Sequence, residues 1–334
     1  MKKMLLFLAL SSAPGAQQVI FDIQKEVILK RNARIHSYSG SMKETGTLKG
    51  KKGLSYKVSF QRPYSYYSEV TSKGAFKGSV YCYDGKTLKV YFPEKKFGYT
   101  YENLKPLSIK EAISHTKKNF EWHVKNYRVK LGKVRKVAGK NSLNLIYTPR
   151  SNKPFWYTFS AWAYEYYAFP LKVEYQTPVP ASYEFTRIAF NRKIDKNIFT
   201  FKFPEGAAIA RYNFDSKNYT LKQARAEANY PMNLPVEKKM GMKLKKLVKA
   251  DGFIPAFTAY YKSSPYEMYI STVRDYGIKI VPDRGVKMKG KTSYFVNFMG
   301  VYTTVIFLYK GVYYTVVSNL PYQKILETCE QLQG

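Results

Sequence analysis

The chain has 334 residues, with 56 Lys and Arg against 23 Asp and Glu, and its formal net charge at pH 7 is +33. This length is enough for two domains with a core in each, and the 17% of aromatic residues favours β-strands as the main element. No stretch approaches the ~20 consecutive apolar residues of a spanning helix, which excludes a helical membrane anchor of that kind.

The positive charge has two interpretations. Such a field attracts anionic partners, namely nucleic acid, an anionic lipid surface, lipopolysaccharide phosphates or an acidic protein segment. The other interpretation is a solvated, Lys-rich surface that gives solubility or thermal tolerance. The Lys residues are spread along the chain, so both interpretations stay open.

The N-terminus has the pattern of a secretory signal peptide over residues 1–16. Two Lys precede an apolar run from Met4 to Leu10, small residues follow, and cleavage is predicted after Ala16. We therefore expect an exported, periplasmic protein, which argues against nucleic acid as the physiological partner. Cys82 and Cys329 could pair in an oxidising compartment, but their apolar contexts favour two buried free thiols.

Helical spacing of apolar residues predicts a helix over 17–35, ended by a turn at Ser39-Gly40. A capping box of Ser108 and Glu111 predicts a second helix with a Lys-rich exposed side. Asp84-Gly85 predicts a hairpin turn. The strands predicted around these features cover residues 46–49, 54–62, 66–71, 79–83, 86–92, 127–137, 143–147 and 155–160.

Residues 169–206 predict a strand, a Pro-marked turn, a second strand, a short linker and a third strand. In the third strand Phe199, Phe201 and Phe203 alternate with polar residues, which predicts three rings on one face of a sheet. Pro204 and Gly206 then end the pairing.

A break in the pattern over 207–249 predicts a linker with a short helix at 221–228. Residues 250–334 predict a smaller α+β domain that ends in a helix opened by Pro321. The apolar face of that helix is formed by Tyr322, Ile325, Leu326, Cys329 and Leu332. The strands predicted in this domain cover residues 256–261, 267–273, 292–299, 302–309 and 312–317.

Catalytic chemistry is absent from the sequence. The only His residues are His36, His115 and His123, and the last two are too far apart on one predicted helix to ligate one ion. There is no nucleophile elbow, phosphate loop, zinc-protease motif or Cys-x-x-Cys pair. Glu165 and Glu174 are near in sequence, but two solvated carboxylates on a strand face explain this pair better than a catalytic site does. We expect no enzymatic activity, no metal and no cofactor.

Several local patterns resemble the MucB/RseB family and the related outer-membrane lipoprotein carriers of the LolA/LolB-like fold. Together they cover about residues 19–206. They are Ser37-Tyr38-Ser39-Gly40 after a helix, Arg62-Pro63 after a strand, Asp84-Gly85-Lys86 with Val90-Tyr91-Phe92-Pro93, 134–139 followed by 143–149, and the strands at 170–175 and 199–206.

The resemblance implies a LolA-like domain over 17–206, a half-open antiparallel β-barrel with a helical lid over an apolar cavity, followed by a smaller C-terminal α+β domain. It also implies that Arg62 latches the lid through buried acceptors such as helix-end carbonyls; the alternative is a surface Arg at a strand edge. Ser68 departs from the carrier pattern, which has an aromatic there. The candidate cavity residues are Val58, Phe60, Arg62, Tyr66, Ile113, Phe120, Phe185, Phe199 and Phe201.

Residues 318–321 and the helix after them resemble the end of the second MucB/RseB domain, which single-domain carriers lack. The first hypothesis is therefore a periplasmic regulator of envelope stress. It binds an acyl chain or lipoprotein in the cavity and an anti-sigma factor-type membrane protein through the C-terminal domain. The second is a carrier that sorts lipoproteins to the outer membrane. The third is a cationic module that binds lipopolysaccharide or DNA without a lipid cavity.

Overall fold

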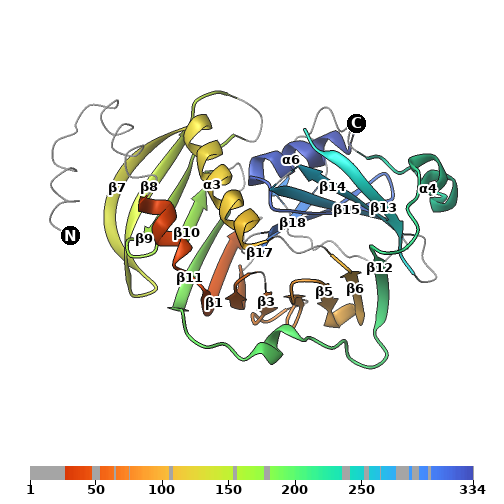
Figure 1. Cartoon of the computed structure of the whole chain (residues 1–334), viewed down its shortest axis with the longest axis horizontal. Coiled ribbons are helices and arrows are strands. Elements are labelled where there is room, and N and C mark those ends of the chain that lie inside the picture. Colours follow the sequence, from red (N-terminus) through yellow and green to blue (C-terminus); the bar gives the residue numbers. More distant parts are fainter. Residues whose placement is uncertain are drawn as a thin grey trace.

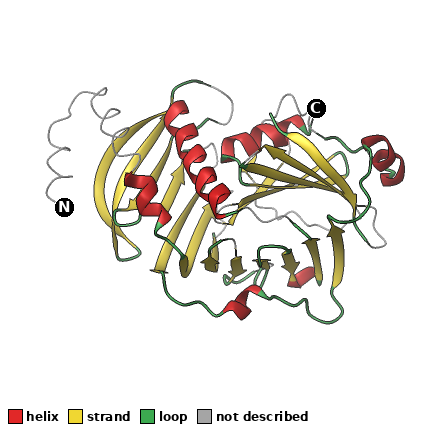
Figure 2. Cartoon of the chain, in the orientation of Figure 1, coloured by secondary structure: helices red, strands yellow, loops and turns green. Residues whose placement is uncertain are grey.

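Two β-sheets, with helices packed on them, make up the computed structural model of the chain (Figure 1). Strands predominate over helices (Figure 2). The residues that the structure describes are 27–46, 53–63, 65–74, 76–104, 108–152, 156–176, 181–234, 241–251, 256–263, 265–275, 286–287, 293–299 and 302–333. The predicted signal peptide lies outside them, and so do residues 17–26 of the first predicted helix and residues 47–49 of the first predicted strand.

The first sheet has twelve strands in the order β12-β6-β5-β4-β3-β2-β1-β11-β10-β9-β8-β7. Its pairs are antiparallel except for the parallel pair of β12 and β6. Among the described residues β7 and β12 are its edges, so the sheet is open. Its strands are β1 (Ser37–Gly46), β2 (Leu54–Gln61), β3 (Ser65–Val70), β4 (Val80–Tyr83), β5 (Leu88–Phe92), β6 (Phe97–Glu102), β7 (Tyr127–Val137), β8 (Lys140–Pro149), β9 (Phe159–Tyr164), β10 (Phe169–Tyr175), β11 (Ala181–Phe190) and β12 (Ala208–Asn213).

The second sheet has seven strands in the order β13-β14-β15-β19-β18-β17-β16. Its antiparallel hairpins are local in sequence, as the turn patterns predict. Its strands are β13 (Lys243–Lys249), β14 (Ala256–Ser263), β15 (Tyr266–Arg274), β16 (Val286–Lys287), β17 (Ser293–Met299), β18 (Tyr302–Tyr309) and β19 (Val312–Ser318).

Apart from two short 3-10 helices, the helices lie on the inner side of the curved first sheet and against the second sheet (Figure 1). Residues 27–33 are helical, within the range predicted for the first helix. The Ser108–Glu111 capping box starts α3, as predicted. The remaining helices are α3 (Ile109–Asn126), α4 (Leu221–Ala228), α6 (Tyr322–Gln331) and the short η1 (Pro93–Lys95) and η2 (Lys196–Phe199).

The first sheet is assembled from two meanders, β2 to β6 and β7 to β11, which β1 joins by pairing with β2 and β11. The turn predicted at Ser39-Gly40 is wrong, because both residues are in β1. Gly40 is needed there for close approach: a Cβ at this position would lie 2.2 Å from the carbonyl oxygen of Arg187. The β1–β11 register shifts just beyond it, between Ser41 and Met42.

The third strand predicted around Phe199, Phe201 and Phe203 is also wrong. Its first residue ends η2, and the residues after it have no strand partner. The segment instead crosses the outer face of the first sheet. The rings of Phe201 and Phe203 lie 5.9 and 6.1 Å from the ring of Tyr91 on β5, and Lys89 Nζ donates to the carbonyl of Phe201 at 2.7 Å.

The range 207–249, predicted as a linker, contains regular structure. The predicted helix at 221–228 is confirmed as α4, but β12 completes one edge of the first sheet and β13 begins the second. The strand predicted at 155–160 begins later, at Phe159, because the ring of Trp156 is stacked on that of Tyr127, 5.8 Å away. The thiols of Cys82 and Cys329 are both free and buried, as predicted.

The second sheet carries a filled core. Residues of β14, β15, β18 and β19 alternate between a face packed on α6 and α4 and a face directed at the first sheet. The predicted apolar face of α6 is confirmed, since all five of its residues are buried in this core. Pro321 is the N-cap residue of that helix.

Candidate ligand-binding cavity

A cavity of about 550 Å³ lies between the inner face of the first sheet and the helices that cover it. One side is formed by β1 to β5 and β7 to β11. The opposite side is formed by the helix over 27–33 and by α3. Residues at the start of α6 form a further part of the wall. Its size falls within the ~300–1,000 Å³ of typical small-molecule sites.

The wall of the cavity is mainly aliphatic and aromatic. The rings of Tyr38 and Phe60 are stacked with centroids 5.1 Å apart, and Phe169 lies at the same distance from Tyr38. Ile28 and Leu29 face these rings from the helix over 27–33. A site of this composition binds by removing apolar surface from water.

Six of the nine predicted cavity residues line this one cavity: Val58, Phe60, Arg62, Tyr66, Phe120 and Phe185. The other three lie elsewhere. Ile113 is on α3, but its side chain is 46% exposed and outside the lining. Phe199 and Phe201 belong to the segment on the outer face of the sheet. Their assignment to the cavity is therefore wrong, because it depended on the third strand that does not form.

Arg62 joins the sheet to the helix over 27–33. Its Nη2 donates to the main-chain carbonyl of Asn32 at 3.3 Å, and its backbone N–H donates to the carbonyl of His36 at 2.8 Å. The guanidinium thus meets a helix carbonyl, as the latch hypothesis requires. Burial lowers the pKa of Arg62. A second guanidinium of the lining, that of Arg31, donates to the carbonyl of Glu165 at 2.8 Å.

The two imidazoles of α3, that of the buried His115 and that of the half-buried His123, lie at the cavity wall and are neutral hydrogen-bond donors. His123 Nδ1–H donates to the carbonyl of Asn119 at 2.7 Å, and burial lowers its pKa to about 4. His115 Nε2–H donates to the carbonyl of Asn319 at 2.6 Å, and burial lowers its pKa too. Each ring uses one nitrogen to satisfy a carbonyl, which is a packing role.

The second sheet also contributes to the cavity, which sequence reasoning missed. Tyr269 on β15, Thr303 on β18 and Val317 on β19 line it, and so do residues 320–323 at the start of α6. No local pattern marks these residues as wall residues, because only the packing of the second sheet against the first brings them there.

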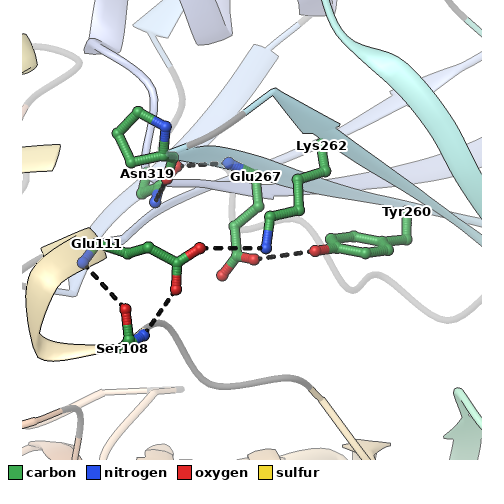
Figure 3. Close-up of polar contacts among 7 residues, drawn as sticks. Ser108, Glu111, Tyr260, Lys262, Glu267 and Asn319 are labelled. Atoms are coloured by element: carbon green, nitrogen blue, oxygen red, sulfur yellow. Dashed lines mark hydrogen bonds and ion pairs between the residues drawn. The ribbon is translucent and has the colours of Figure 1, made fainter. Parts of the chain in front are cut away.

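The start of α3 is held against the second sheet by polar contacts (Figure 3). Glu111 Oε1 lies 3.7 Å from Lys262 Nζ on β14, while Glu111 Oε2 accepts from the backbone N–H of Ser108 at 2.8 Å. That N–H holds the pKa of Glu111 below its usual value. On the sheet side, Asn319 Oδ1 accepts from the backbone N–H of Glu267 at 2.8 Å. The position of α3 therefore depends on both sheets.

Within the described part of the chain, no three His, Cys, Asp or Glu side chains lie close enough together to hold a metal ion. No helix there is long and apolar enough to cross a membrane. Glu174 is 2.7 Å from Lys172 Nζ, in an ion pair along β10.

No family model and no curated protein matches the chain. Among solved structures, the predicted resemblance is confirmed. The chain is similar to the crystal structure of MucB, with 13% identity, a TM-score of 0.44 and coverage of 93% of this chain and 95% of that one. It is also similar to the MucA/MucB complex from Pseudomonas aeruginosa (13%, 0.43, 91% and 96%) and to a LolA superfamily protein from Nitrosomonas europaea (12%, 0.25, 53% and 97%).

Proposed function

We propose that this protein is a non-enzymatic, periplasmic binding protein of the MucB/RseB kind that holds an acyl chain in the cavity. The observation that carries the proposal is the cavity itself, which is lined by apolar side chains and enclosed between an open sheet and two helical segments. In this function the helix over 27–33 and α3 act as a lid, and Arg62 holds the lid to the sheet through Asn32.

Apolar burial is sufficient for tight binding without catalytic groups. Each buried methylene contributes ~0.8 kcal/mol, so a long acyl chain contributes on the order of 10 kcal/mol before ordering costs. The guanidinium groups of Arg31 and Arg62 give the same cavity an electrostatic attraction for an anionic head group.

A regulator differs from a carrier in that ligand binding must alter the contact with a protein partner. In this chain the cavity wall includes the second sheet and the start of α6. A ligand that fills the cavity therefore touches the second sheet and α6, and it can shift them. A partner bound to the C-terminal part of the chain would then be affected. MucB has been crystallised in complex with MucA(peri). We propose a partner of the same type here, an anti-sigma factor-like membrane protein.

Binding of a fluorescent long-chain fatty acid to the full exported chain tests the cavity. We expect saturable binding that competes with unlabelled stearic acid, and Ala163→Leu, which places a larger side chain in the lining, should weaken it about tenfold. Unsaturable binding that falls steeply with salt would instead indicate the cationic module. Equal binding by the wild type and Ala163→Leu would contradict the cavity as the site.

Mass spectrometry of material that co-purifies from the periplasm separates the regulator from the carrier. Recovery of a membrane protein's periplasmic segment, released on addition of the fatty acid, is the result expected of a regulator. Recovery of acylated lipoproteins that pass to an acceptor membrane is the result expected of a carrier and would overturn the regulator.

A further inference from the structure

One part of the cavity wall is polar, and it lies where the beginning of α6 meets α3. Two contacts define this place. His115 on α3 donates to the carbonyl of Asn319, just before α6. Trp156 donates from Nε1 to Glu327 on α6 at 3.0 Å, and its ring lies 5.4 Å from that of Trp122 on α3.

Two amide side chains lie at this junction. Asn119 is one helical turn beyond His115 on α3, and Gln323, in the first turn of α6, follows Asn319 by four residues. Both line the cavity. Gln323 is only 2% exposed although it is a polar residue, so its amide is enclosed together with the apolar wall.

Both amides have an unmet hydrogen-bonding capacity. Asn119 Oδ1 and Gln323 Oε1 are buried, and among the described residues neither has a hydrogen-bond partner. A buried amide oxygen left without a donor destabilises the fold. Both belong to residues that line one cavity, which indicates that a polar group of a ligand meets this part of the wall.

A hydroxyl group fits these amides best. Its single hydrogen satisfies one of the two amide oxygens, and its lone pairs can accept from an amide NH₂, whichever way each amide is turned. A carboxylate only accepts and would satisfy neither oxygen. The apolar wall around the amides accommodates the hydrocarbon on either side of such a hydroxyl.

We propose that Asn119 and Gln323 form a hydroxyl-recognition subsite, and that the ligand is an acyl chain hydroxylated along its length. This inference rests on the proposed function, since it names the chemical class of the chain held in the cavity. It also makes the start of α6 a ligand contact, so a hydroxylated chain links the two sheets through one hydrogen-bonded group.

The test compares stearic acid with a set of stearic acids hydroxylated at different positions, using the full exported chain. For at least one position we expect the wild type to bind the hydroxylated acid about fivefold to tenfold more tightly. Gln323→Met and Asn119→Leu keep the side-chain size and remove the amide, and each should bring the ratio of the two affinities close to one.

Gln331→Met is the matched control. Gln331 is on the same helix and its Oε1 is also buried without a partner in the described chain, but it does not line the cavity. We expect this variant to keep the wild-type preference. Because both acids are measured on one preparation, their affinity ratio does not depend on the folded fraction, and thermal melts show which variants are folded.

Two results are distinguishable. If the wild type binds stearic acid but has the same affinity for every hydroxylated acid, the amides serve only bound water and the subsite proposal is overturned while the cavity function stands. If no acid binds at all, the proposed function itself fails. A preference retained in both Gln323→Met and Asn119→Leu overturns the assignment to these residues.

Discussion

The buried faces of the two sheets are packed differently. The second sheet packs on α6 in a core where Phe307 and Tyr314 are stacked at 5.1 Å with almost no exposure. The first sheet keeps its helices far enough away to enclose about 550 Å³. Both are aromatic and aliphatic, so composition does not explain the difference.

The difference follows from how each helix is held. α6 buries five apolar side chains of its own in the second sheet's core. Polar contacts hold the start of α3 to the second sheet through Glu111 and His115, and one guanidinium ties the helix over 27–33 to the first sheet. The apolar side chains Phe120, Trp122 and Val124 of α3 pack against the small cluster around Tyr127 and Phe159, on the β7–β10 side of the first sheet.

The largest contrast is expected from removing one Phe from each face. Phe307→Ala should lower the free energy of unfolding by about 3–5 kcal/mol, because it creates a new void in a filled core. Phe60→Ala should cost about half as much, because the half-buried ring already faces an empty space. Urea denaturation of both variants measures this. Equal losses would contradict the view that only the first sheet is hollow.

Enlarging an Ala should give the opposite contrast. Ala259→Leu, at a fully buried position of the second core, should destabilise the protein by about 1–3 kcal/mol through overpacking. Ala163→Leu should change the free energy of unfolding by less than about 1 kcal/mol while it weakens fatty-acid binding. Thermal melts with and without ligand check both. A large loss of stability in Ala163→Leu would show that this side of the cavity is already packed.

The first sheet also carries a carboxyl group with a raised pKa, which makes the stability of the protein depend on pH. Glu44 on β1 accepts from the hydroxyl of Tyr56 at 2.6 Å, and burial raises its pKa from 4.5 to about 7. The folded state therefore keeps a proton that the unfolded chain loses, so stability falls as the pH rises from 4.5 to about 7 and the loss is complete above that.

Glu44→Gln should remove this loss. We expect the variant to be more stable than the wild type at about pH 8, by roughly 1–2 kcal/mol, and to match it at about pH 4. Urea denaturation across this range gives the two curves. Parallel curves for variant and wild type would mean that Glu44 titrates normally.

The smallest effect on stability is expected at Arg62, which is proposed to hold the helix over 27–33 to the sheet. Arg62→Leu should change the free energy of unfolding by less than about 1 kcal/mol, because it removes one partly exposed hydrogen bond to Asn32. The dissociation rate of a bound fatty acid should nevertheless rise several-fold. Stopped-flow displacement measures it, with Arg34→Leu, an exposed Arg of the same segment, as control. An unchanged rate would make Arg62 a strand-edge residue only.

Much of the fold could be predicted because its determinants are local. The Asp84-Gly85 turn, the capping box of α3 and the apolar face of α6 each depend on residues within a few positions of one another. Most hairpins of the second sheet were predicted for the same reason. The strand β6 was missed, although Tyr99 and Tyr101 alternate there.

The wrong predictions concern residues whose conformation is determined by tertiary packing and not by the local sequence. Phe201 and Phe203 alternate as in a strand, but the alternation is satisfied by Tyr91 on the outer face of the sheet. Gly40 resembles a turn residue, yet it is required by the carbonyl of Arg187, far along the chain. Gln323 could not be foreseen as a wall residue, since its cavity is formed by elements from both sheets.

The pairing of β1 with β11 has a consequence for how the chain acquires its structure. Tyr38 is opposite Phe190, so the seam between the two meanders closes only after most of the first sheet has been synthesised. Contacts this distant in sequence slow folding, because loop-closure entropy is lost before the contacts form. Because the chain is synthesised from its N-terminus, the rings around the future cavity stay exposed until β11 has emerged. We therefore expect the nascent first sheet to depend on a holding chaperone, whereas the hairpins of the second sheet can form as they appear.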